Sequence, residues 1–505
     1  MAKSYLLTKS KITSGLQCEK RLWFDFHNRI EKDNYLFHLG NRFGDVVRKY
    51  YGSGVDLSNN IFNTDLALKD TSKAIEDEKV KVIYEGAFVY SDTLVRTDVM
   101  LRKKDGWELL EAKSSTKLKE EYVDDIAIQS YIIKASKQKN KIKINSVKLI
   151  HIDNEFTYQG DKEYSELIND DNDITDEVLF KEKIVQAYID KFKPLADKNY
   201  PEPKIETGNH CLKPHKCIYL QRCNSLKQHS NITPISILPL VGKKLEKKYK
   251  DRGITDLKDV PPSELNESQR IIQQAHKDNE PKINPNLSKI FKEFKWPFYF
   301  MDFETVTQGV PVIKGTQPYY PLPFQWSVHK WDSPNAKISD GMSFLDFSDQ
   351  NIERKFVESL LDAVGNEGTI FAHHASTEIK VLEKLKDKDS CKDLAEKIDN
   401  LIIRVKDTLN IVKNNFYAPA MNGDYDLKNI IKAIPSDISY EEKGNISDGK
   451  EAQLAWFIYT DPETPPDKRK KQIELLKEYC SKDTLALYYL IKYLIKKERV
   501  QDQLL

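Results

Sequence analysis

The sequence lacks any run of apolar residues long enough to cross a bilayer, which takes about 20 residues as a helix. Its first residues, MAKSYLLTKS, lack the apolar segment of a secretory signal peptide. It also lacks an excess of charge of either sign, because 79 basic residues stand against 78 acidic ones. These absences argue against a membrane protein and against nucleic-acid binding through an overall positive field. We expect a cytoplasmic protein without a membrane partner, in which any surface for a charged ligand is local.

The length of 505 residues predicts more than one domain, since single hydrophobic cores stop growing beyond about 250–300 residues. In the N-terminal part, a helical pattern over 8–50 precedes predicted strands over 80–90, 93–102, 107–113 and 146–153 and a helix over 122–136. In the C-terminal part, the pattern predicts strands over 298–302, 324–331 and 369–373 and helices over 377–385 and 469–497. Strands that alternate with helices are typical of α/β folds.

Composition divides the chain into three parts. Residues 1–225 and 291–505 carry the strand and helix patterns, so the fold class is a multidomain α/β protein. Residues 226–290 are rich in lysine, glutamate and proline, and contain two short apolar segments, 237–245 and 253–257, with a glycine-containing turn. We expect this middle part to be a helical linker, with a helix-hairpin-helix that binds the DNA backbone as the alternative.

The first candidate site lies on the predicted strand over 107–113. Glu111 and Lys113 are two residues apart and therefore project from the same face of the strand. Asp98 lies on the preceding strand, and Gln129 on the following helix. Two carboxylates can hold a hard divalent cation, and a lysine beside them can stabilise the charge that develops at phosphorus. These residue types suit hydrolysis of a phosphodiester bond.

This order of motifs resembles the RecB-like branch of the PD-(D/E)xK nucleases over about residues 10–225, which implies a restriction-endonuclease-like core. The resemblance implies metal binding by Asp98 and Glu111 and catalytic roles for Lys113 and Gln129. RecB-like enzymes often carry a histidine on the N-terminal helical segment, and this sequence has none at the expected place. Glu85 is the alternative third ligand, beside a purely structural role for that residue.

Three of the six cysteines, Cys211, Cys217 and Cys223, lie within thirteen residues, and none forms the CxxC pair of a common zinc site. A set of four sulfur ligands needs one more cysteine, and Cys18 is the leading candidate. One cysteine before the nuclease core and three after it resembles the iron–sulfur staple of RecB-like nucleases of the AddB and CRISPR-adaptation type. The resemblance implies a [4Fe–4S] cluster.

Two alternatives to the cluster stay open. Zn²⁺ can take the place of the cluster, with His210 or His215 in place of one sulfur, and the cysteines can also be merely buried. Cys391 and Cys480 fall outside the set, and we expect them to be small buried apolar residues.

The second candidate site begins at the end of the apolar strand that starts at residue 298. Asp302 and Glu304 share one face of this strand, Glu378 follows a later strand, and Tyr479 and Asp483 share one face of a C-terminal helix. Carboxylates that converge from three segments repel one another unless cations lie between them. The pattern therefore predicts two Mg²⁺ or Mn²⁺ ions that serve phosphodiester hydrolysis.

This second set resembles the DnaQ-like, or DEDD, 3′–5′ exonucleases of the ribonuclease H fold over about residues 294–500. A tyrosine four residues before the last aspartate is the mark of the DEDDy subtype, in which Tyr479 would orient the attacking water. Glu378 stands where the family normally has aspartate. We expect His373 and His374 to pack or donate hydrogen bonds, and Asp407 to be an accessory residue.

The combination of both domains with the cysteine staple resembles an uncharacterised bacterial family known only as a domain of unknown function; the segments 425–428 and 447–449 fit it too. We expect a DNA nuclease of repair or of defence against foreign DNA. RNA is the alternative substrate, and a nucleic-acid-binding assembly protein with one or both centres inactive is the alternative class. The sequence identifies no protein partner.

Overall fold

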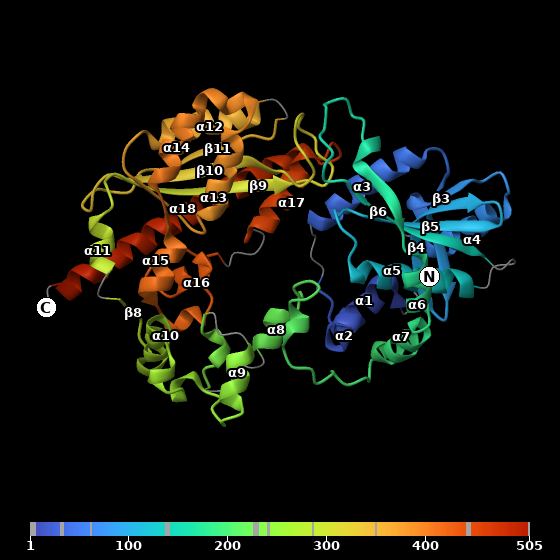
Figure 1. Ribbon diagram of the computed structural model, residues 1–505, viewed down its shortest axis with the longest axis horizontal. Helices are drawn as coiled ribbons and strands as arrows, with labels where there is room; N and C mark the ends of the chain where they lie inside the picture. The colour runs from blue at the N-terminus through green and yellow to red at the C-terminus, as the bar shows by residue number, and fades with distance from the viewer. Residues whose placement is uncertain are drawn as a thin grey trace. The chain divides into compact units, whose positions relative to one another are not determined.

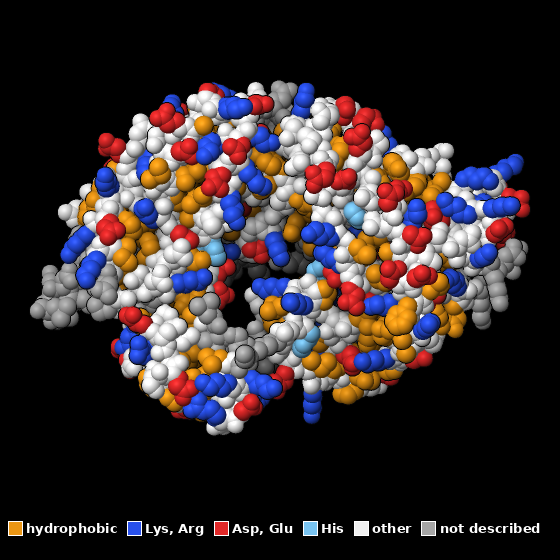
Figure 2. Space-filling view, in the orientation of Figure 1, with side chains coloured by type: hydrophobic (Ala, Val, Ile, Leu, Met, Phe, Trp, Pro, Cys, Tyr) orange, Lys and Arg blue, Asp and Glu red, His pale blue; other side chains and the backbone are white. Residues whose placement is uncertain are grey.

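The computed structural model describes residues 7–30, 35–60, 63–136, 142–225, 232–239, 243–284, 287–348, 351–440 and 446–502 (Figure 1). It has the expected mixed α/β architecture and forms two compact units. The first unit comprises Met1–Ser230 and Gln308–Tyr320, and the second comprises Asn231–Thr307 and Pro321–Leu505. Basic and acidic side chains are interspersed on the visible faces, in line with the balanced composition (Figure 2).

None of the helices that the structure describes is both long enough and apolar enough to pass through a membrane.

The first unit is built on a seven-stranded sheet in the order β2-β3-β4-β5-β6-β7, with β1 paired to β4. The strands are β1 (Leu7–Thr8), β2 (Val55–Asp56), β3 (Val82–Tyr90), β4 (Thr93–Lys103), β5 (Gly106–Lys113), β6 (Ile144–Ile152) and β7 (Ile168–Asp173). β3, β4 and β5 form the antiparallel meander that the sequence predicts, and β6 runs parallel to β5.

Helices cover both faces of this sheet. The helices of this unit are α1 (Lys9–Gln17), α2 (Glu19–His27), α3 (Tyr35–Tyr51), α4 (Thr64–Glu76), α5 (Glu120–Ala135), α6 (Thr175–Glu182), α7 (Val185–Phe192) and α8 (Leu220–Ser225). Leu109 of β5 packs with Ile126 of α5, whereas Leu110 packs with Phe43 of α3 on the other face. Because side chains alternate along a strand, Glu111 points to the α5 face together with Leu109.

The segment Gln308–Tyr320, which joins two strands of the second unit, belongs to the first unit by its contacts. The Arg42 guanidinium donates to Gln308 Oε1 at 2.8 Å, and the Tyr158 backbone N–H donates to Thr316 O at 3.1 Å. The hydroxyls of Ser114 and Tyr319 lie 3.1 Å apart. The first unit is therefore assembled from two separate stretches of sequence.

The second unit is built on a five-stranded sheet in the order β11-β10-β9-β12-β13. The strands are β9 (Phe298–Thr307), β10 (Pro321–Trp331), β11 (Met342–Leu345), β12 (Thr369–Ala372) and β13 (Val405–Asp407). β10 pairs antiparallel with β9 and β11, whereas β12 runs parallel to β9 and β13. The predicted strands of this part of the chain are confirmed, and a short β8 (Lys282–Ile283) pairs with β14 (Phe416–Tyr417).

Helices pack on both faces of the second sheet as well. The helices of this unit are α9 (Lys243–Lys250), α10 (Glu267–Asp278), α11 (Leu287–Lys292), α12 (Ile352–Val364), α13 (Ser376–Lys386), α14 (Ala395–Arg404), α15 (Thr408–Asn415), α16 (Leu427–Lys432), α17 (Gly449–Thr460) and α18 (Pro466–Asp502). Phe300 of β9 packs with Leu487 of α18, whereas Met301 packs with Phe356 of α12 on the other face. Asp302 and Glu304 follow Phe300 in steps of two and therefore face α18.

The middle part of the chain packs into the core of the second unit. Leu238, Tyr249 and Leu257 share one hydrophobic cluster with Ile430 and Leu490. Residues 226–231 and 240–242 lie outside the described residues, so the helix-hairpin-helix alternative stays a prediction.

Candidate metal centres

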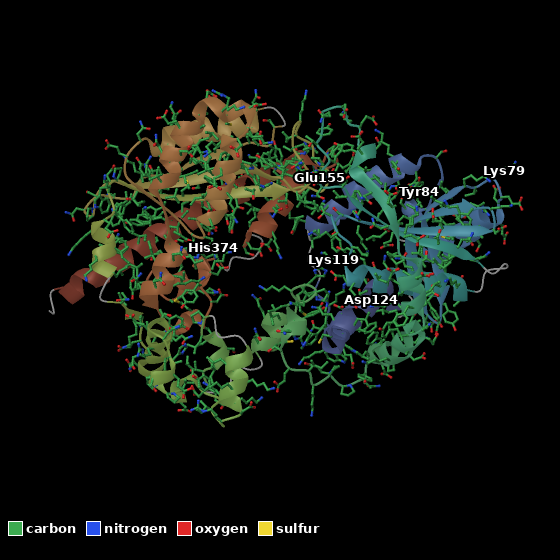
Figure 3. All side chains as sticks on the ribbon, in the orientation of Figure 1. Lys79, Tyr84, Lys119, Asp124, Glu155 and His374 are labelled. Atoms are coloured by element: carbon green, nitrogen blue, oxygen red, sulfur yellow. The ribbon has the colours of Figure 1, made fainter. Side chains whose placement is uncertain are left out.

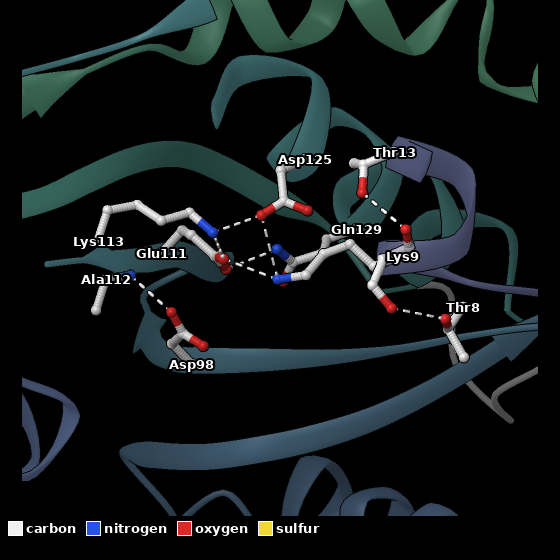
Figure 4. A network of polar contacts seen from close by, with 10 residues as sticks. Thr8, Lys9, Thr13, Asp98, Glu111, Ala112, Lys113, Asp125 and Gln129 are labelled. Atoms are coloured by element: carbon white, nitrogen blue, oxygen red, sulfur yellow. Dashed lines mark hydrogen bonds and ion pairs between the residues drawn. The ribbon is translucent and has the colours of Figure 1, made fainter. Parts of the chain in front are cut away.

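The first cluster of charged residues lies between β5 and α5 (Figure 4). Lys113 Nζ is 2.7 Å from Glu111 Oε1 and 2.5 Å from Asp125 Oδ2. Gln129 Nε2 donates to Glu111 Oε2 at 2.6 Å, and the Glu111 side chain is 1% exposed. Glu111 and Lys113 lie two residues apart on β5, and Gln129 comes from the following helix α5. The three predicted residues thus belong to one hydrogen-bonded network.

Asp98 lies on β4 beside this network. Its Oδ2 accepts the backbone N–H of Ala112 at 2.7 Å. Burial, together with the negative charge of Glu111, raises the pKa of Asp98 to about 7. Burial would also raise the pKa of Glu111, but the ammonium groups of Lys113 and Lys9 outweigh it and lower that pKa below its usual value. One carboxyl of the pair therefore holds a proton near neutral pH while the other is ionised.

The sequence reasoning missed Lys9, the first residue of α1. Its Nζ is 2.7 Å from Glu111 Oε1 and 3.5 Å from Asp125 Oδ2. The Thr8 side chain caps α1 by accepting the Lys11 N–H, which places Lys9 in the first helical turn. Thr8 before a helical pattern indicates the start of a helix at Lys9. Nothing in the local sequence, however, relates Lys9 to Glu111, about 100 positions away. Two ammonium groups thus face three carboxyl groups in this cluster.

Glu85 interrupts the pairing of β3 with β4. The register passes from Tyr84↔Val99 to Gly86↔Thr97, and Glu85 takes a left-handed φ of 55° at the position opposite Asp98. Burial raises the pKa of the Glu85 carboxyl, and the charge of Glu111 adds to this rise. The residue thus lies within electrostatic reach of the cluster, and its role as a third ligand stays a prediction.

Four cysteines line one small cavity in the first unit. Cys18 lies at the junction of α1 and α2, Cys223 lies on α8, and Cys211 and Cys217 lie on the segment before α8. All four are free thiols, and burial raises the pKa of Cys217 and of Cys223. The sequence-predicted set of four is therefore brought together by the fold.

Side-chain hydrogen bonds tie Cys18 to the segment that carries the other three. Gln17 Nε2 donates to the backbone oxygens of His210 and His215, each at 2.7 Å. The Cys217 backbone N–H donates to Cys211 O at 2.8 Å, and the Tyr219 hydroxyl donates to Asp25 Oδ1 at 2.8 Å. The N-terminal helices and the end of the first unit are thus joined directly around the cavity.

The spacing of the sulfur atoms bears on what the cavity can hold. Among the described residues, no three of the four sulfurs lie within 4.8 Å of one another. A tetrahedral zinc site with Zn–S bonds of about 2.3 Å requires sulfurs about 3.8 Å apart. Any three of the four sulfurs therefore include at least one pair farther apart than in a four-thiolate zinc site. His210 Nε2 lies 3.5 Å from Cys211 Sγ, so the zinc alternative with a histidine ligand stays open.

The second cluster lies where β9 meets α18. One ligand atom each from Asp302, Glu304 and Cys480 lies within 4.8 Å of the others. Asp483 is one helical turn beyond Tyr479 on α18, and Glu378 lies in the first turn of α13. Cys480 was expected to be a small buried apolar residue, and it is indeed 0% exposed. Its surroundings are not apolar, however, because its Sγ lies 3.7 Å from Asp302 Oδ2.

Burial and neighbouring charges raise the pKa of the acidic residues in this cluster. Burial raises the pKa of Asp302 and of Glu304 well above the usual value, and the negative charges of Asp483 and Glu378 raise them further. Burial raises the pKa of Asp483 to about 6, while the Tyr440 hydroxyl, which donates to its Oδ1 at 2.7 Å, opposes the rise. These groups favour the protonated form unless a cation compensates their charge.

Glu378 is the carboxylate whose identity departs from the resembling family. It is 4% exposed, and burial raises its pKa to about 8. Its Oε2 finds no hydrogen-bond partner among the residues that the structure describes. A buried carboxyl oxygen without a partner costs free energy, and a cation is one group that could satisfy it.

Two further side chains of the cluster were not predicted as site residues. Tyr440 contacts Asp483 directly, and Lys428 Nζ lies 5.4 Å from the ring centres of both Tyr440 and Tyr479. Lys428 falls in the segment 425–428, which only the family resemblance singles out. The sequence pattern around Lys428 and Tyr440 gives no indication that either residue lies near the cluster.

A cavity of about 710 Å³ opens onto the second cluster. Asp302, Tyr479 and Asp483 line it, together with Lys428 and His374, which is labelled in Figure 3.

The accessory residues near this cavity have structural partners. His373 makes hydrogen bonds of 2.9 Å with Thr408 Oγ1 and with Tyr425 O, which confirms the expected packing role. Asp407 accepts the Leu409 N–H and caps α15.

Removal of the Glu378 charge is expected to stabilise the metal-free second unit at alkaline pH. Because its folded-state pKa is raised, the carboxyl binds more protons folded than unfolded, so its contribution to stability falls as pH rises from about 4.5 to about 8. Glu378→Gln should match the wild type near pH 4 and melt higher at pH 8, by roughly 5 °C for an effect of about 2 kcal/mol. Thermal melts in EDTA across this range measure the difference; a difference independent of pH would contradict the assignment.

Comparison with known proteins adds a limited family match. Residues 299–426 match the model of a family described as a domain of unknown function (DUF2779). The matched stretch begins within β9 and contains Asp302, Glu304 and Glu378, but it ends before Tyr479 and Asp483.

No curated protein matches the chain significantly. A solved structure titled "Crystal structure of SSO0001" is similar to 43% of this chain and 85% of its own, at 13% identity and a TM-score of 0.19. A TM-score of this size supports no statement about fold or function.

Proposed function

We propose that the chain is a metal-dependent nuclease with two hydrolytic centres, a RecB-like one around Glu111 and a DnaQ-like 3′–5′ exonuclease one around Asp302. The observation that carries the proposal is the second cluster, in which ligand atoms of Asp302 and Glu304 on β9 lie within 4.8 Å of each other and the charges of Glu378 on α13 and Asp483 on α18 act on both. Such a cluster is stabilised by divalent cations, and a pair of cations suits in-line attack on a phosphodiester. Mg²⁺ or Mn²⁺ fits the oxygen donors.

In the second centre, Asp302, Glu304, Glu378 and Asp483 would hold the two ions. Bound there, the ions would supply activation of a water and stabilisation of the leaving oxygen. Tyr479, beside Asp483 on α18, orients the attacking water by its hydroxyl. The cavity next to the carboxyls receives the terminal nucleotide, with Lys428 among the lining side chains that favour a phosphate.

In the first centre, Asp98 and Glu111 would hold a divalent ion. Gln129 holds the Glu111 carboxylate in place by its 2.6 Å hydrogen bond. Lys113 stabilises the negative charge that develops on the phosphate during cleavage, which is the usual role of a cation at such a position. Lys9 shares Glu111 Oε1 with Lys113 and therefore adjusts the charge that the ion meets.

DNA is the substrate that we propose first, with a role in repair or in defence against foreign DNA. RNA is the alternative, because DnaQ-like domains act on both polymers. The alternative class, a nucleic-acid-binding protein with inactive centres, is disfavoured by the presence of both sets of acidic residues in compact clusters. End-labelled single- and double-stranded DNA and RNA, digested with Mg²⁺ or Mn²⁺, test these options; absence of any cleavage would reject the enzyme.

We further propose that Cys18, Cys211, Cys217 and Cys223 bind one [4Fe–4S] cluster that joins the N-terminus to the end of the first unit. Four sulfurs around one cavity form the donor set of such a cluster. The cysteines close a loop that contains the entire first sheet except β1. A group bound there would stabilise the fold of the first unit.

Protein purified without oxygen is expected to be brown and to contain iron with acid-labile sulfide. Cys18→Ser should lose the colour and destabilise the first unit, because the site closes a long loop. Cys391→Ser is the matched control, since Cys391 is buried in the second unit away from this cavity and should leave the iron content unchanged. Stoichiometric zinc without iron would contradict the iron–sulfur cluster but would still support a metal site that joins the two ends of the first unit. Protein without any bound metal would contradict both.

A further inference from the structure

Cys480 occupies an unusual place for a buried cysteine. It follows Tyr479 on α18, is fully buried, and directs its Sγ to 3.7 Å from both the Oδ2 and the backbone oxygen of Asp302. A sulfur, a carboxyl oxygen of Asp302 and a carboxyl oxygen of Glu304 thus lie within 4.8 Å of one another.

The other buried cysteine of this unit shows what ordinary packing looks like. Cys391 belongs to a hydrophobic cluster with Leu360, Leu394 and Ile398. Cys480 instead has its Sγ within 4.8 Å of a carboxyl oxygen of Asp302 and of Glu304. The sulfur of Cys480 is thus placed among carboxyl oxygens, whereas that of Cys391 belongs to an apolar cluster.

A second observation indicates a ligand at this place. The Glu378 Oε2, from a residue 4% exposed, has no hydrogen-bond partner among the described residues, and the charge of Glu378 acts on both Asp302 and Glu304. A cation bound by Asp302 and Glu304 would compensate this buried carboxylate.

The donor set distinguishes between cations. Mg²⁺ binds almost entirely through oxygen and dehydrates reluctantly, whereas Zn²⁺ and its heavier relative Cd²⁺ accept thiolate and carboxylate together in four-coordinate sites. On binding, the S–H bond of Cys480 breaks, a sulfur–metal bond forms, and the proton leaves to solvent. No oxidant or other reactant is needed.

We propose that Asp302, Glu304 and Cys480 form a binding site for one thiophilic divalent cation of the Zn²⁺ class, which inhibits the second centre by occupying the carboxylates that hydrolysis requires. The inhibitory part of this inference rests on the proposed exonuclease function, and the binding part does not. The second centre would thus be active with Mg²⁺ or Mn²⁺ and inhibited by Zn²⁺ bound to the Cys480 thiolate.

The binding test uses the full-length protein with Cd²⁺ as the probe, because a cadmium–thiolate bond absorbs in the near ultraviolet. The four cysteines of the first unit would also bind Cd²⁺, so the measured quantity is the difference in absorbance between variants. Cys480→Ala should remove one Cd²⁺–thiolate absorbance increment that Cys391→Ala retains, and Asp302→Asn should weaken it. Equal absorbance in the wild type and in both cysteine variants would overturn the proposal. Cys480→Ser serves in place of Cys480→Ala if the alanine variant does not fold.

The inhibition test compares Zn²⁺ titrations of 3′-end degradation in Mg²⁺, with the first centre disabled. Half-inhibition should need about 10–100-fold more Zn²⁺ in Cys480→Ala, the scale on which altered metal surroundings change affinity. Equal sensitivity of the two proteins would overturn the proposal and leave the exonuclease function intact. An absorbance increment specific to Cys480 in a protein without nuclease activity would uphold the site and reject the exonuclease.

Discussion

Asp302→Asn is expected to abolish the release of mononucleotides from a 3′ end. Asp302 lies at the centre of the second cluster, close to Glu304 and to the sulfur of Cys480. The substitution removes a ligand charge while it keeps the shape of the side chain. We expect a loss on the order of a thousandfold or more, because even one lost hydrogen-bond donor to a transition state costs about 10²–10³-fold.

The fold should survive this substitution. In the metal-free protein, the charge of Asp483 and burial already disfavour the ionised form of Asp302, so an amide relieves repulsion. The Asp302→Asn variant should melt in EDTA at or above the melting temperature of the wild type. Such a result would show that its loss of activity is not caused by unfolding. Glu378→Asp is the complementary variant, and it should retain activity if residue 378 is a metal ligand, since aspartate is the residue of the resembling family.

The measurement is a digestion ladder in which the first centre is disabled in every protein by Lys113→Ala. Strands with a free and with a blocked 3′ end are compared, labelled at the 5′ end. The single variant should shorten only the free strand, and addition of Asp302→Asn should stop this. If the double variant still shortens the free strand but not the blocked one, the assignment of the exonuclease to Asp302 is wrong.

Lys113→Ala is expected to lower cleavage by the first centre by on the order of a hundredfold, the scale of one lost electrostatic stabiliser. Nucleic-acid binding should stay nearly intact, because the lysine contacts Glu111 and Asp125 inside the cluster and does not form a surface patch. Lys9 still neutralises Glu111 in this variant, so the fold should persist. Both expectations are tested in an Asp302→Asn background. The turnover rate tests the loss of cleavage, and the affinity for nucleic acid tests whether binding stays intact.

A matched control comes from the same unit. Lys134 on α5 forms a comparable ion pair with Glu182 at 2.8 Å, away from the cluster, and Lys134→Ala should leave turnover unchanged. Lys9→Ala should shift the divalent-ion concentration needed for half-maximal rate, because Lys9 competes for the same Glu111 oxygen as the ion. Full cleavage by the Lys113→Ala, Asp302→Asn double variant would refute the first centre.

The residues that sequence analysis could place are those governed by local periodicity. The two-residue spacing of Glu111 and Lys113, and of Asp302 and Glu304, decides their face as soon as each segment is a strand. Helical spacing does the same for Tyr479 and Asp483. These pairs therefore appear in the structure on the predicted faces of β5, β9 and α18.

What the sequence could not supply depends on contacts between distant segments. Lys9 reaches Glu111 across about 100 residues, and Tyr440 reaches Asp483 from a segment without regular structure. Cys480 falls outside the predicted set of cysteines, and only the approach of β9 to α18 brings its sulfur to a carboxyl. Burial and tertiary approach decide these cases, and neither has a local pattern.

The split composition of the first unit affects its synthesis as well as its form. Gln308–Tyr320 supplies Gln308 to Arg42, Thr316 to Tyr158 and Tyr319 to Ser114. A ribosome releases the chain from its N-terminus, and domains usually fold in that order. Here the first unit stays unfinished until residue 320 has left the exit tunnel, after Asn231–Thr307 of the second unit have been made. A gene truncated after residue 225 would encode the first catalytic cluster without this closing piece.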